Sequence, residues 1–171
     1  TFARTDGSVV ATGSVTKCFG LIGLRVGWIA APEDMIARFR DFRDYLTHTL
    51  SPLSDYLAAL ALERREMFLR KAISLLRKNR KTLCHVAAST PGLSIVQPEG
   101  GIVAFLAYDY QLPSDEFARG LIEKYGVFVL PGSGFKLDRA FRVNMGQDCA
   151  LFRQAMDCIR SYCGELALES T

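Results

Sequence analysis

Apolar side chains recur at helical spacing after Pro32. Met35, Phe39, Phe42 and Leu46 are separated by three or four residues, which is the spacing of one face of an α-helix. Pro32 precedes two acidic residues, as is typical of a helix start. The motif THTLSP ends the pattern, because the residue before a proline disfavours the helical conformation. We predict this helix, a second at residues 52–64 and a longer third at residues 66–88.

Apolar runs of strand length flank this helical region. Two come first: residues 8–12, ending in a Gly-Ser turn, and the almost wholly apolar GLRVGWIAA (23–31), which is typical of a strand covered on both faces. From residue 93, LSIVQPEGGIVAFLAYDY predicts two strands joined by a Pro-Glu-Gly-Gly turn. The runs VFVLPGSGF (127–135) and RAFRVNMG (139–146) predict two more strands.

Two further helices are predicted in the second half. The run PSDEFARGLIEKYG (113–126) has Ser114 or Asp115 as its N-cap and Gly126 as its stop. A closing helix at about residues 150–164 would turn four side chains inward, namely Leu151, Ala155, Cys158 and Tyr162. The chain therefore reads as a strand pair, a helical connector and a compact α+β module from about residue 90 onward.

A strand pair does not make a sheet-based domain by itself. We therefore divide the chain into residues 1–65, the end of a larger domain with connecting helices, and residues 66–171, a long linking helix and a small α+β domain. The chain also begins at Thr1, within a pattern, so we expect that sequence upstream is missing.

Composition limits the classes of function. The 171 residues are 49% hydrophobic and 23% charged, which is ordinary for a soluble globular protein. A net charge of +3 is too small to indicate binding to nucleic acid or to an anionic membrane. The five cysteines follow no metal-binding spacing, so we expect reduced thiols, no metal site and a cytoplasmic protein. No apolar stretch is long enough to span a bilayer.

Two cations stand in the segment GSVTKCFGLIGLRVGW (13–28), where most neighbours are apolar. A desolvated lysine at position 17 would have a lowered pKa, and its neutral amine could form a Schiff base with a carbonyl compound. A lysine that reaches solvent from a turn is the alternative. Arg25, within a predicted strand, calls for a carboxylate or a phosphate.

The hydroxyls of Ser14 and Thr16 add donors of the kind found in phosphate sites. An aldehyde for Lys17 and a phosphate for Arg25 together describe pyridoxal 5′-phosphate (PLP). A phosphate loop is the rival interpretation, but GSVTKC lacks the glycine before the lysine and the Ser or Thr after it. The segment GLIGLRVG is not a GxGxxG motif either.

A third cation, Arg142, lies in the predicted strand RAFRVNMG. An arginine on an edge strand can be purely structural, but an anion would also explain it. Arg139 stands at the polar start of the same strand and is explained by solvent.

The segment SVTKCFGLIGLRVG (14–27) resembles the surroundings of the cofactor lysine in class I/II PLP-dependent aminotransferases of fold type I. That pattern has small residues three before and just before the lysine, and an arginine eight after it. PEGGIVAFL, VFVLPGSGF and FRVNMG follow in the order of the family's C-terminal portion. The resemblance covers essentially the whole chain and implies the end of a large PLP-binding α/β domain followed by a smaller α+β domain.

The resemblance also implies roles for single residues. Lys17 would bind the cofactor as a Schiff base and shuttle a proton. Ser14, Thr16 and Arg25 would bind the cofactor, Ser14 and Arg25 through its phosphate, Arg142 would bind the substrate α-carboxylate, and Gly101 would let the backbone approach the substrate. Pro131 and Gly132 would shape a loop near the site. The implied reaction is transamination between an amino acid and a 2-oxo acid in a homodimer.

The family's partner for the pyridine nitrogen, an aspartate, lies well upstream of the lysine, and Asp6 is too near Lys17 to be that residue. We therefore expect that these 171 residues do not catalyse transamination alone. Two other functions stay open: a PLP-dependent lyase, decarboxylase or synthase on the same scaffold, and a non-catalytic module in which the basic run RKAISLLRKNRK (70–81) binds a partner or nucleic acid. The usual explanation of such a run is a solvated helix face.

Overall fold

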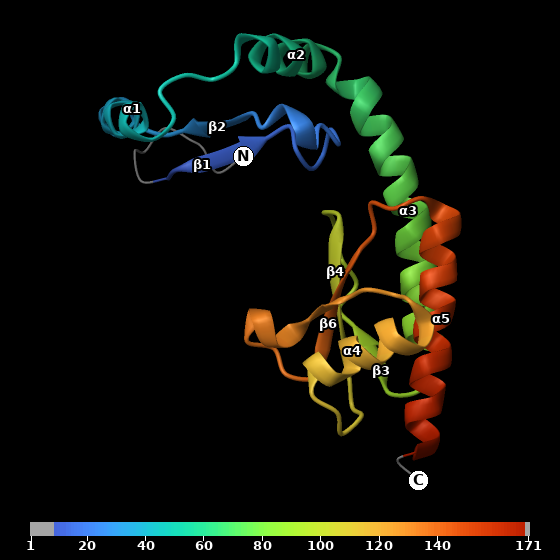
Figure 1. Ribbon diagram of the computed structural model, residues 1–171. Coiled ribbons are helices and arrows are strands. Elements are labelled where there is room, and N and C mark those ends of the chain that lie inside the picture. Colours follow the sequence, from blue (N-terminus) through green and yellow to red (C-terminus); the bar gives the residue numbers. More distant parts are fainter. Residues whose placement is uncertain (1–8, 170–171) are drawn as a thin grey trace. The chain divides into compact units, whose positions relative to one another are not determined.

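The structure is a computed structural model that describes residues 9–169 (Figure 1). Asp6 lies outside the described residues, and so does Ser8, the first residue of the first predicted strand. The chain divides into two compact units, Thr1–Ala72 and Ile73–Thr171. The division falls within helix α3 (Arg65–Ser89), and our predicted boundary after residue 65 lies at the start of that helix. Each unit is described by itself.

The first unit contains one antiparallel strand pair. Strand β1 (Ala11–Ser14) pairs with β2 (Gly27–Ala30), so that Ser14 lies opposite Gly27. The connection between them contains a short 3₁₀ helix, η1 (Ile22–Leu24). Strand β1 ends later than predicted, because the Gly-Ser pair expected to form a turn belongs to it. Strand β2 is shorter than predicted, because the chain straightens only after Arg25. All four residues of β2 are exposed, whereas we predicted burial on both faces.

Helices α1 (Glu33–Leu46) and α2 (Pro52–Glu63) confirm the predicted helical stripe and the break before Pro52. The side chain of Ser51 caps α2 by accepting a hydrogen bond from the backbone of Ser54. The buried core of this unit is small: Val15, Val26 and Ala58 form one cluster, and Ala61 is buried as well. Many large apolar side chains of the unit are exposed instead, including Trp28, Phe42, Tyr45, Leu46, Leu53 and Tyr56.

The second unit is built on a four-stranded antiparallel sheet in the order β3-β4-β6-β5. The strands are β3 (Leu93–Ile95), β4 (Val103–Tyr108), β5 (Leu130–Pro131) and β6 (Ala140–Asn144). Helices α4 (Ser114–Tyr125) and α5 (Cys149–Glu169) accompany α3 in this unit. The predicted α+β module is thus present.

The two faces of this sheet differ in character. On β4 and β6 the cross-strand pairs Ala104–Val143 and Leu106–Phe141 are buried, in one core with side chains of α3, α4 and α5, such as Leu83, Phe117 and Met156. The alternate pairs, Val103–Asn144 and Phe105–Arg142, lie on the other face. Their side chains are exposed or half-buried, so the helices cover one face of the sheet and leave these residues accessible.

Two predictions about the helices need correction. Leu151 was expected on the inner face of the closing helix but is 63% exposed. The buried residues of α5 are Phe152, Met156, Ile159, Tyr162, Cys163 and Leu166. The inward position predicted for Tyr162 is therefore confirmed, whereas the larger side chains of Phe152, Met156 and Ile159 are buried in place of Leu151, Ala155 and Cys158. The N-cap of α4 is Pro113, and Ser114 is a buried helical residue. The predicted stop, Gly126, is confirmed with φ 67°.

The segment VFVLPGSGF is extended over Leu130–Pro131 only. The next four residues form a 3₁₀ turn, η2 (Gly132–Phe135). Glycine is required at position 132, because a Cβ there would lie 2.3 Å from the carbonyl oxygen of Leu137. The buried hydroxyl of Ser114 accepts a hydrogen bond from the backbone N–H of Ser133 at 3.0 Å. These contacts, rather than strand pairing, fix the conformation after Pro131.

All five cysteines are free thiols. Among residues 9–169, no three His, Cys, Asp or Glu side chains gather as a metal site would require. None of the described helices combines the length and the apolar character needed to cross a membrane.

Candidate functional site

Lys17 lies in the connection between β1 and β2, which backbone hydrogen bonds close at its base. The N–H of Val15 donates to Val26 at 3.3 Å, and the N–H of Leu21 donates to Val15 at 3.2 Å. The Lys17 carbonyl accepts from Gly20 at 3.2 Å. The Lys17 side chain is exposed. The desolvation that we expected for its amine is therefore not provided by the described residues of this chain.

The hydroxyl of Ser14 orders the residues before Lys17. Its Oγ accepts a hydrogen bond from the N–H of Thr16 at 3.0 Å, a local turn that serine commonly forms. The Ser14 carbonyl accepts from the thiol of Cys18 at 3.7 Å. Ser14 and Thr16 are both half-buried.

Arg25 lies at the other end of the same connection. The predicted position inside a strand is wrong: Arg25 follows η1 with φ 56° and ψ 36°, in the left-handed region, which costs a non-glycine residue about 1 kcal/mol. This conformation turns the chain from η1 into β2. The guanidinium is exposed, and Nη1 donates only a long bond of 3.4 Å to the carbonyl of Ile22. Neither Arg25 nor Lys17 forms an ion pair with any residue in the range 9–169.

Ser14, Thr16, Lys17 and Arg25 thus occur together on one hairpin connection whose ends are held by pairing of Ser14 with Gly27. Two hydroxyls, a primary amine and a guanidinium without a carboxylate partner form a donor set that fits an anionic phosphate with an aldehyde. The residues present therefore fit the aldehyde and the phosphate of PLP, whereas the aspartate that the resemblance implies for its ring nitrogen lies upstream and is not part of this set.

Arg142 belongs to the second unit and lies on the accessible face of its sheet. It pairs across the strands with Phe105 on one side and Leu130 on the other. Its side chain is half-buried, and its Cζ lies 4.7 Å from the centroid of the Phe135 ring. It has no carboxylate partner among the described residues. Arg139, which we expected to be solvated, is exposed.

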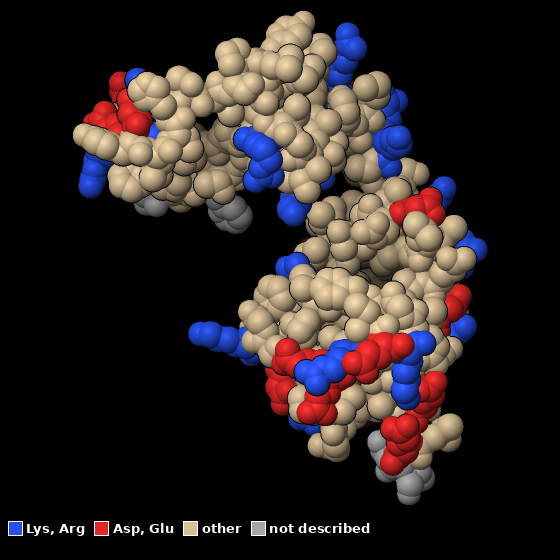
Figure 2. Space-filling view, viewed as in Figure 1, with Lys and Arg blue, Asp and Glu red and all other residues tan. Residues whose placement is uncertain are grey.

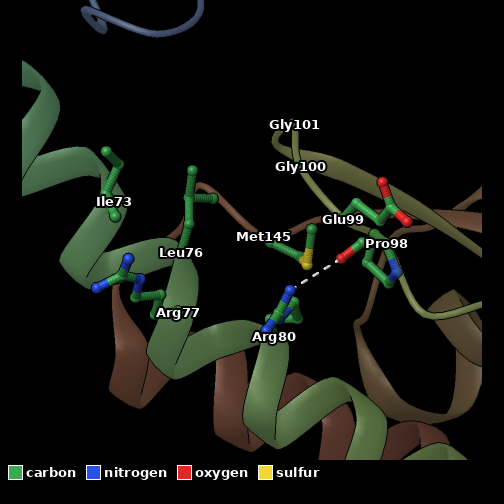
Figure 3. A pocket seen from close by; sticks show the side chains of 9 residues that line it. All are labelled: Ile73, Leu76, Arg77, Arg80, Pro98, Glu99, Gly100, Gly101 and Met145. Atoms are coloured by element: carbon green, nitrogen blue, oxygen red, sulfur yellow. Dashed lines mark hydrogen bonds between the residues drawn. The ribbon is translucent and has the colours of Figure 1, made fainter.

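Gly101 lies before β4 with φ +83°, a conformation that favours glycine. A Cβ at this position would meet no atom within 4 Å, so the backbone here is open to a ligand. Gly101 lines a cavity of about 340 Å³ between α3 and the loop 98–101. Figure 3 shows Met145 between these two walls and Arg80, which donates to the carbonyl of Pro98 at 3.2 Å.

The sequence profile described as aminotransferase class I and II matches residues 1–159. This chain belongs to that family.

This aminotransferase-family chain is similar to two relatives and one solved structure in particular. Capreomycidine synthase of Streptomyces vinaceus is 34% identical over 142 residues, which cover 82% of this chain and 36% of the synthase. Aspartate aminotransferase of Bacillus subtilis (strain 168) is 25% identical over 165 residues, covering 93% and 42%. The crystal structure of the PLP-dependent cyclase OrfR superposes with a TM-score of 0.86 at 27% identity, covering 93% of this chain and 44% of the cyclase.

The aminotransferase-family chain spans about two-fifths of the length of these relatives. The predicted fold class, the end of a fold type I α/β domain followed by a smaller α+β domain, is confirmed by the family match and by the solved structures that superpose on it. Of the residues predicted for the site, Ser14, Thr16, Lys17 and Arg25 belong to the first unit, and Gly101 and Arg142 to the second.

Sequence reasoning missed Asn79, a buried residue in the middle of the basic run on α3. Its amide nitrogen donates to the carbonyls of Met145 and Gln147, at 2.8 Å each. These carbonyls belong to the turn that follows β6, so Asn79 fixes the strand end beyond Arg142. A signal was present: Asn79 lies three residues after Leu76 and four before Leu83, on the apolar side of the helix.

Proposed function

We propose that this chain is the C-terminal part of a PLP-dependent aminotransferase that transfers the amino group of an amino acid to a 2-oxo acid. The observation that carries the proposal is the hairpin connection that holds Ser14, Thr16, Lys17 and Arg25 together, where neither cation pairs with a carboxylate of residues 9–169. Membership of the family supports the choice of cofactor.

Each of these residues has a separate task in the proposal. PLP, when bound, supplies an aldehyde for covalent attachment and a ring that accepts electrons from the substrate. Lys17 provides the amine for that attachment and carries a proton to and from the substrate α-carbon. Arg25 and the hydroxyls of Ser14 and Thr16 hold the phosphate with charge-assisted and neutral hydrogen bonds.

Arg142 and Gly101 serve the substrate in this proposal. The planar guanidinium of Arg142 offers parallel N–H donors that match the two oxygens of an α-carboxylate. Gly101 presents backbone without a side chain, which allows close approach. A bidentate contact fixes the orientation of the amino acid as well as its position.

Exposed apolar side chains support the proposal that the chain is one part of a larger fold. Phe42, Tyr45 and Leu46 of α1 are 65%, 90% and 68% exposed, and such clusters usually meet another surface. The proposal includes a cytoplasmic homodimer with small-molecule substrates. Light scattering of the complete polypeptide would detect the dimer.

Covalent trapping tests the role of Lys17. PLP is added to the chain, borohydride reduces the adduct, and peptide mass spectrometry locates it. We expect a visible absorption band and a reduced adduct on Lys17, both lost in Lys17→Ala and retained in Lys78→Ala, an exposed lysine of α3. Arg25→Ala should weaken retention of the cofactor by about tenfold or more, since a hydrogen bond to a charged group contributes about 1.5–3 kcal/mol. An adduct spread over surface lysines, unchanged in Lys17→Ala, would contradict the proposal.

A second candidate function is a PLP-dependent synthase or cyclase. It is favoured by the 34% identity with capreomycidine synthase over most of this chain and by the superposition on a PLP-dependent cyclase. Product analysis of the complete polypeptide separates the two. Transamination yields a new 2-oxo acid and an aminated acceptor in equal amounts, whereas a synthase or cyclase converts the amino acid without an acceptor. A lyase or decarboxylase would release a β-substituent or carbon dioxide.

The contacts made by the basic run of α3 favour a role in packing over a role in binding nucleic acid. Asn79 and Arg80 of this run form hydrogen bonds within the second unit. On the face of that unit shown in Figure 2, acidic and basic side chains lie next to one another. Such mixed charge does not favour a polyanion.

A further inference from the structure

The guanidinium of Arg142 is one part of a cluster that we call the aromatic clamp, formed by Phe105, Phe135 and Arg142. Arg142 Cζ lies 4.7 Å from the centroid of the Phe135 ring. Phe135 meets Phe105 edge to face, with ring centroids 5.1 Å apart and an interplanar angle of 79°. Phe105 and Arg142 are cross-strand partners on β4 and β6. Each member therefore contacts or neighbours the other two.

This arrangement leaves the hydrogen-bonding groups of Arg142 available. All N–H donors of a guanidinium lie in its plane, and an aromatic ring attracts the cation through its face. The ring can therefore stabilise the charge without occupying a donor. No described carboxylate pairs with Arg142, so the protein holds this cation in place while leaving its donors to another anion.

The position of Phe135 is fixed by the turn that carries it. Phe135 ends η2, and the N–H groups of Lys136 and Leu137 donate back to Ser133 and Gly132 at 3.1 and 3.0 Å. Ser114 holds the same turn from α4. Phe135 is still 42% exposed, so burial of the ring does not by itself account for its place beside Arg142.

We propose that Phe135 is the positioning residue of Arg142, orienting its guanidinium for bidentate binding of a substrate carboxylate. The inference rests on the proposed function, because it takes Arg142 as the carboxylate ligand. A flexible arginine loses side-chain conformational entropy when it binds. Stacking on Phe135 restricts that freedom beforehand, so part of the cost of ordering is met in the free protein.

The test measures carboxylate binding and guanidinium environment separately. The probe is 2-oxoglutarate, titrated into the 171-residue chain and followed by NMR at the Arg142 side-chain N–H, which Arg142→Lys identifies. The free protein should show a ring-current shift at this signal. Phe135→Leu should remove that shift and weaken binding by about three- to tenfold. Phe135→Tyr should retain both, and Phe128→Leu, at a 70% exposed phenylalanine outside the clamp, should change neither.

Fluorinated phenylalanine at position 135 separates the electronic effect from shape, and also applies if Phe135→Leu does not fold. Added fluorine withdraws electron density from the ring face, so binding should weaken in steps as fluorine is added. Equal binding by wild type, Phe135→Leu and the fluorinated proteins would overturn the inference while Arg142 keeps its proposed role. Absence of 2-oxoglutarate binding at Arg142 in the wild type would overturn that role and this inference with it.

Discussion

Cys18 and Cys163 show how strongly the setting of one residue controls its chemistry. Cys18 is exposed, next to Lys17 in the hairpin connection. Cys163 is buried in α5, and burial raises the pKa of its thiol to about 11. Only the thiolate reacts with alkylating reagents, so the two thiols should differ greatly in reactivity near pH 8.

We therefore expect iodoacetamide at pH 8 to modify Cys18 in the folded chain and to leave Cys163 unmodified, as measured by peptide mass spectrometry. In urea both should react, because the pKa of an exposed thiol is about 8.5. PLP should protect Cys18 if Lys17 binds it. Modification of Cys163 at the same rate as Cys18 in the folded chain would contradict the burial described above.

At this scale the sequence showed which residues lie on one segment of the chain, but it did not show their environments. The spacing of Ser14, Thr16, Lys17 and Arg25 indicated one site, and the structure places all four on one connection. Their exposure was not predictable, because an apolar neighbourhood in sequence does not show which surfaces cover it. The left-handed conformation of Arg25 was not predictable either. Such a conformation is usually indicated by a glycine, and this position holds an arginine.

At the scale of elements, Asn79 joins helix α3 to the turn after β6 through two hydrogen bonds. Both partners are carbonyl oxygens, so the amide nitrogen must face them. Asn79→Ala would leave the buried carbonyl of Met145 and the partly buried carbonyl of Gln147 without this donor, and we expect a loss of about 1–3 kcal/mol in the free energy of unfolding, measured by urea denaturation. Asn79→Asp should cost more, because its carboxylate would face two carbonyls.

A matched control is Asn144→Ala. Asn144 is exposed, and its side chain accepts one hydrogen bond from the N–H of Gly146. Its loss should change stability by less than about 1 kcal/mol. Equal effects at positions 79 and 144 would show that the buried amide contributes nothing particular.

Helix and strand positions were predictable where the spacing of apolar residues gave a clear local pattern. The stripe after Pro32 and the stops at Pro52 and Gly126 are strong local signals, and α1, α2 and α4 appear where expected. Three of the four inward positions predicted for α5 were missed by one residue, because two apolar stripes lie side by side and packing chooses the larger one. The short strand β5 was overextended, since the contacts that bend Gly132–Phe135 come from Ser114, distant in the sequence.

At the scale of the whole chain, the two units differ in the size of their cores. Among its described residues the first has four buried apolar side chains, Val15, Val26, Ala58 and Ala61, whereas the core of the second draws on β4, β6 and all three of its helices. Because stability depends largely on buried apolar area, we expect the first unit to unfold at lower urea concentration than the second.

The single tryptophan, Trp28, lies in the first unit and reports its unfolding. Its fluorescence should change at lower urea than the far-UV circular dichroism, to which the helices of the second unit contribute. A double variant, Trp28→Phe with Phe128→Trp, moves the fluorescent reporter to the second unit and should shift the fluorescence transition to higher urea. Coincident transitions for both reporters would contradict independent cores.

The division into the end of one domain and a small α+β module was accessible from the order of elements alone. The sequence did not predict which face of the small sheet would remain open. That depends on three helices, whose apolar side chains all pack against the same face of the sheet. The family match then confirmed the resemblance to class I and II aminotransferases.

The unequal faces of the small sheet also bear on how such proteins diverge. Positions such as Leu106 and Phe141 face the helices, and a change there endangers folding. Positions such as Val103, Phe105 and Asn144 face outward, and under the proposed function a change there would alter what Arg142 can bind. Because the two sets alternate along the same strands, new ligand preferences can evolve by single substitutions that leave the hydrophobic interior intact. A scaffold with this division can acquire different chemistries without first gaining surplus stability.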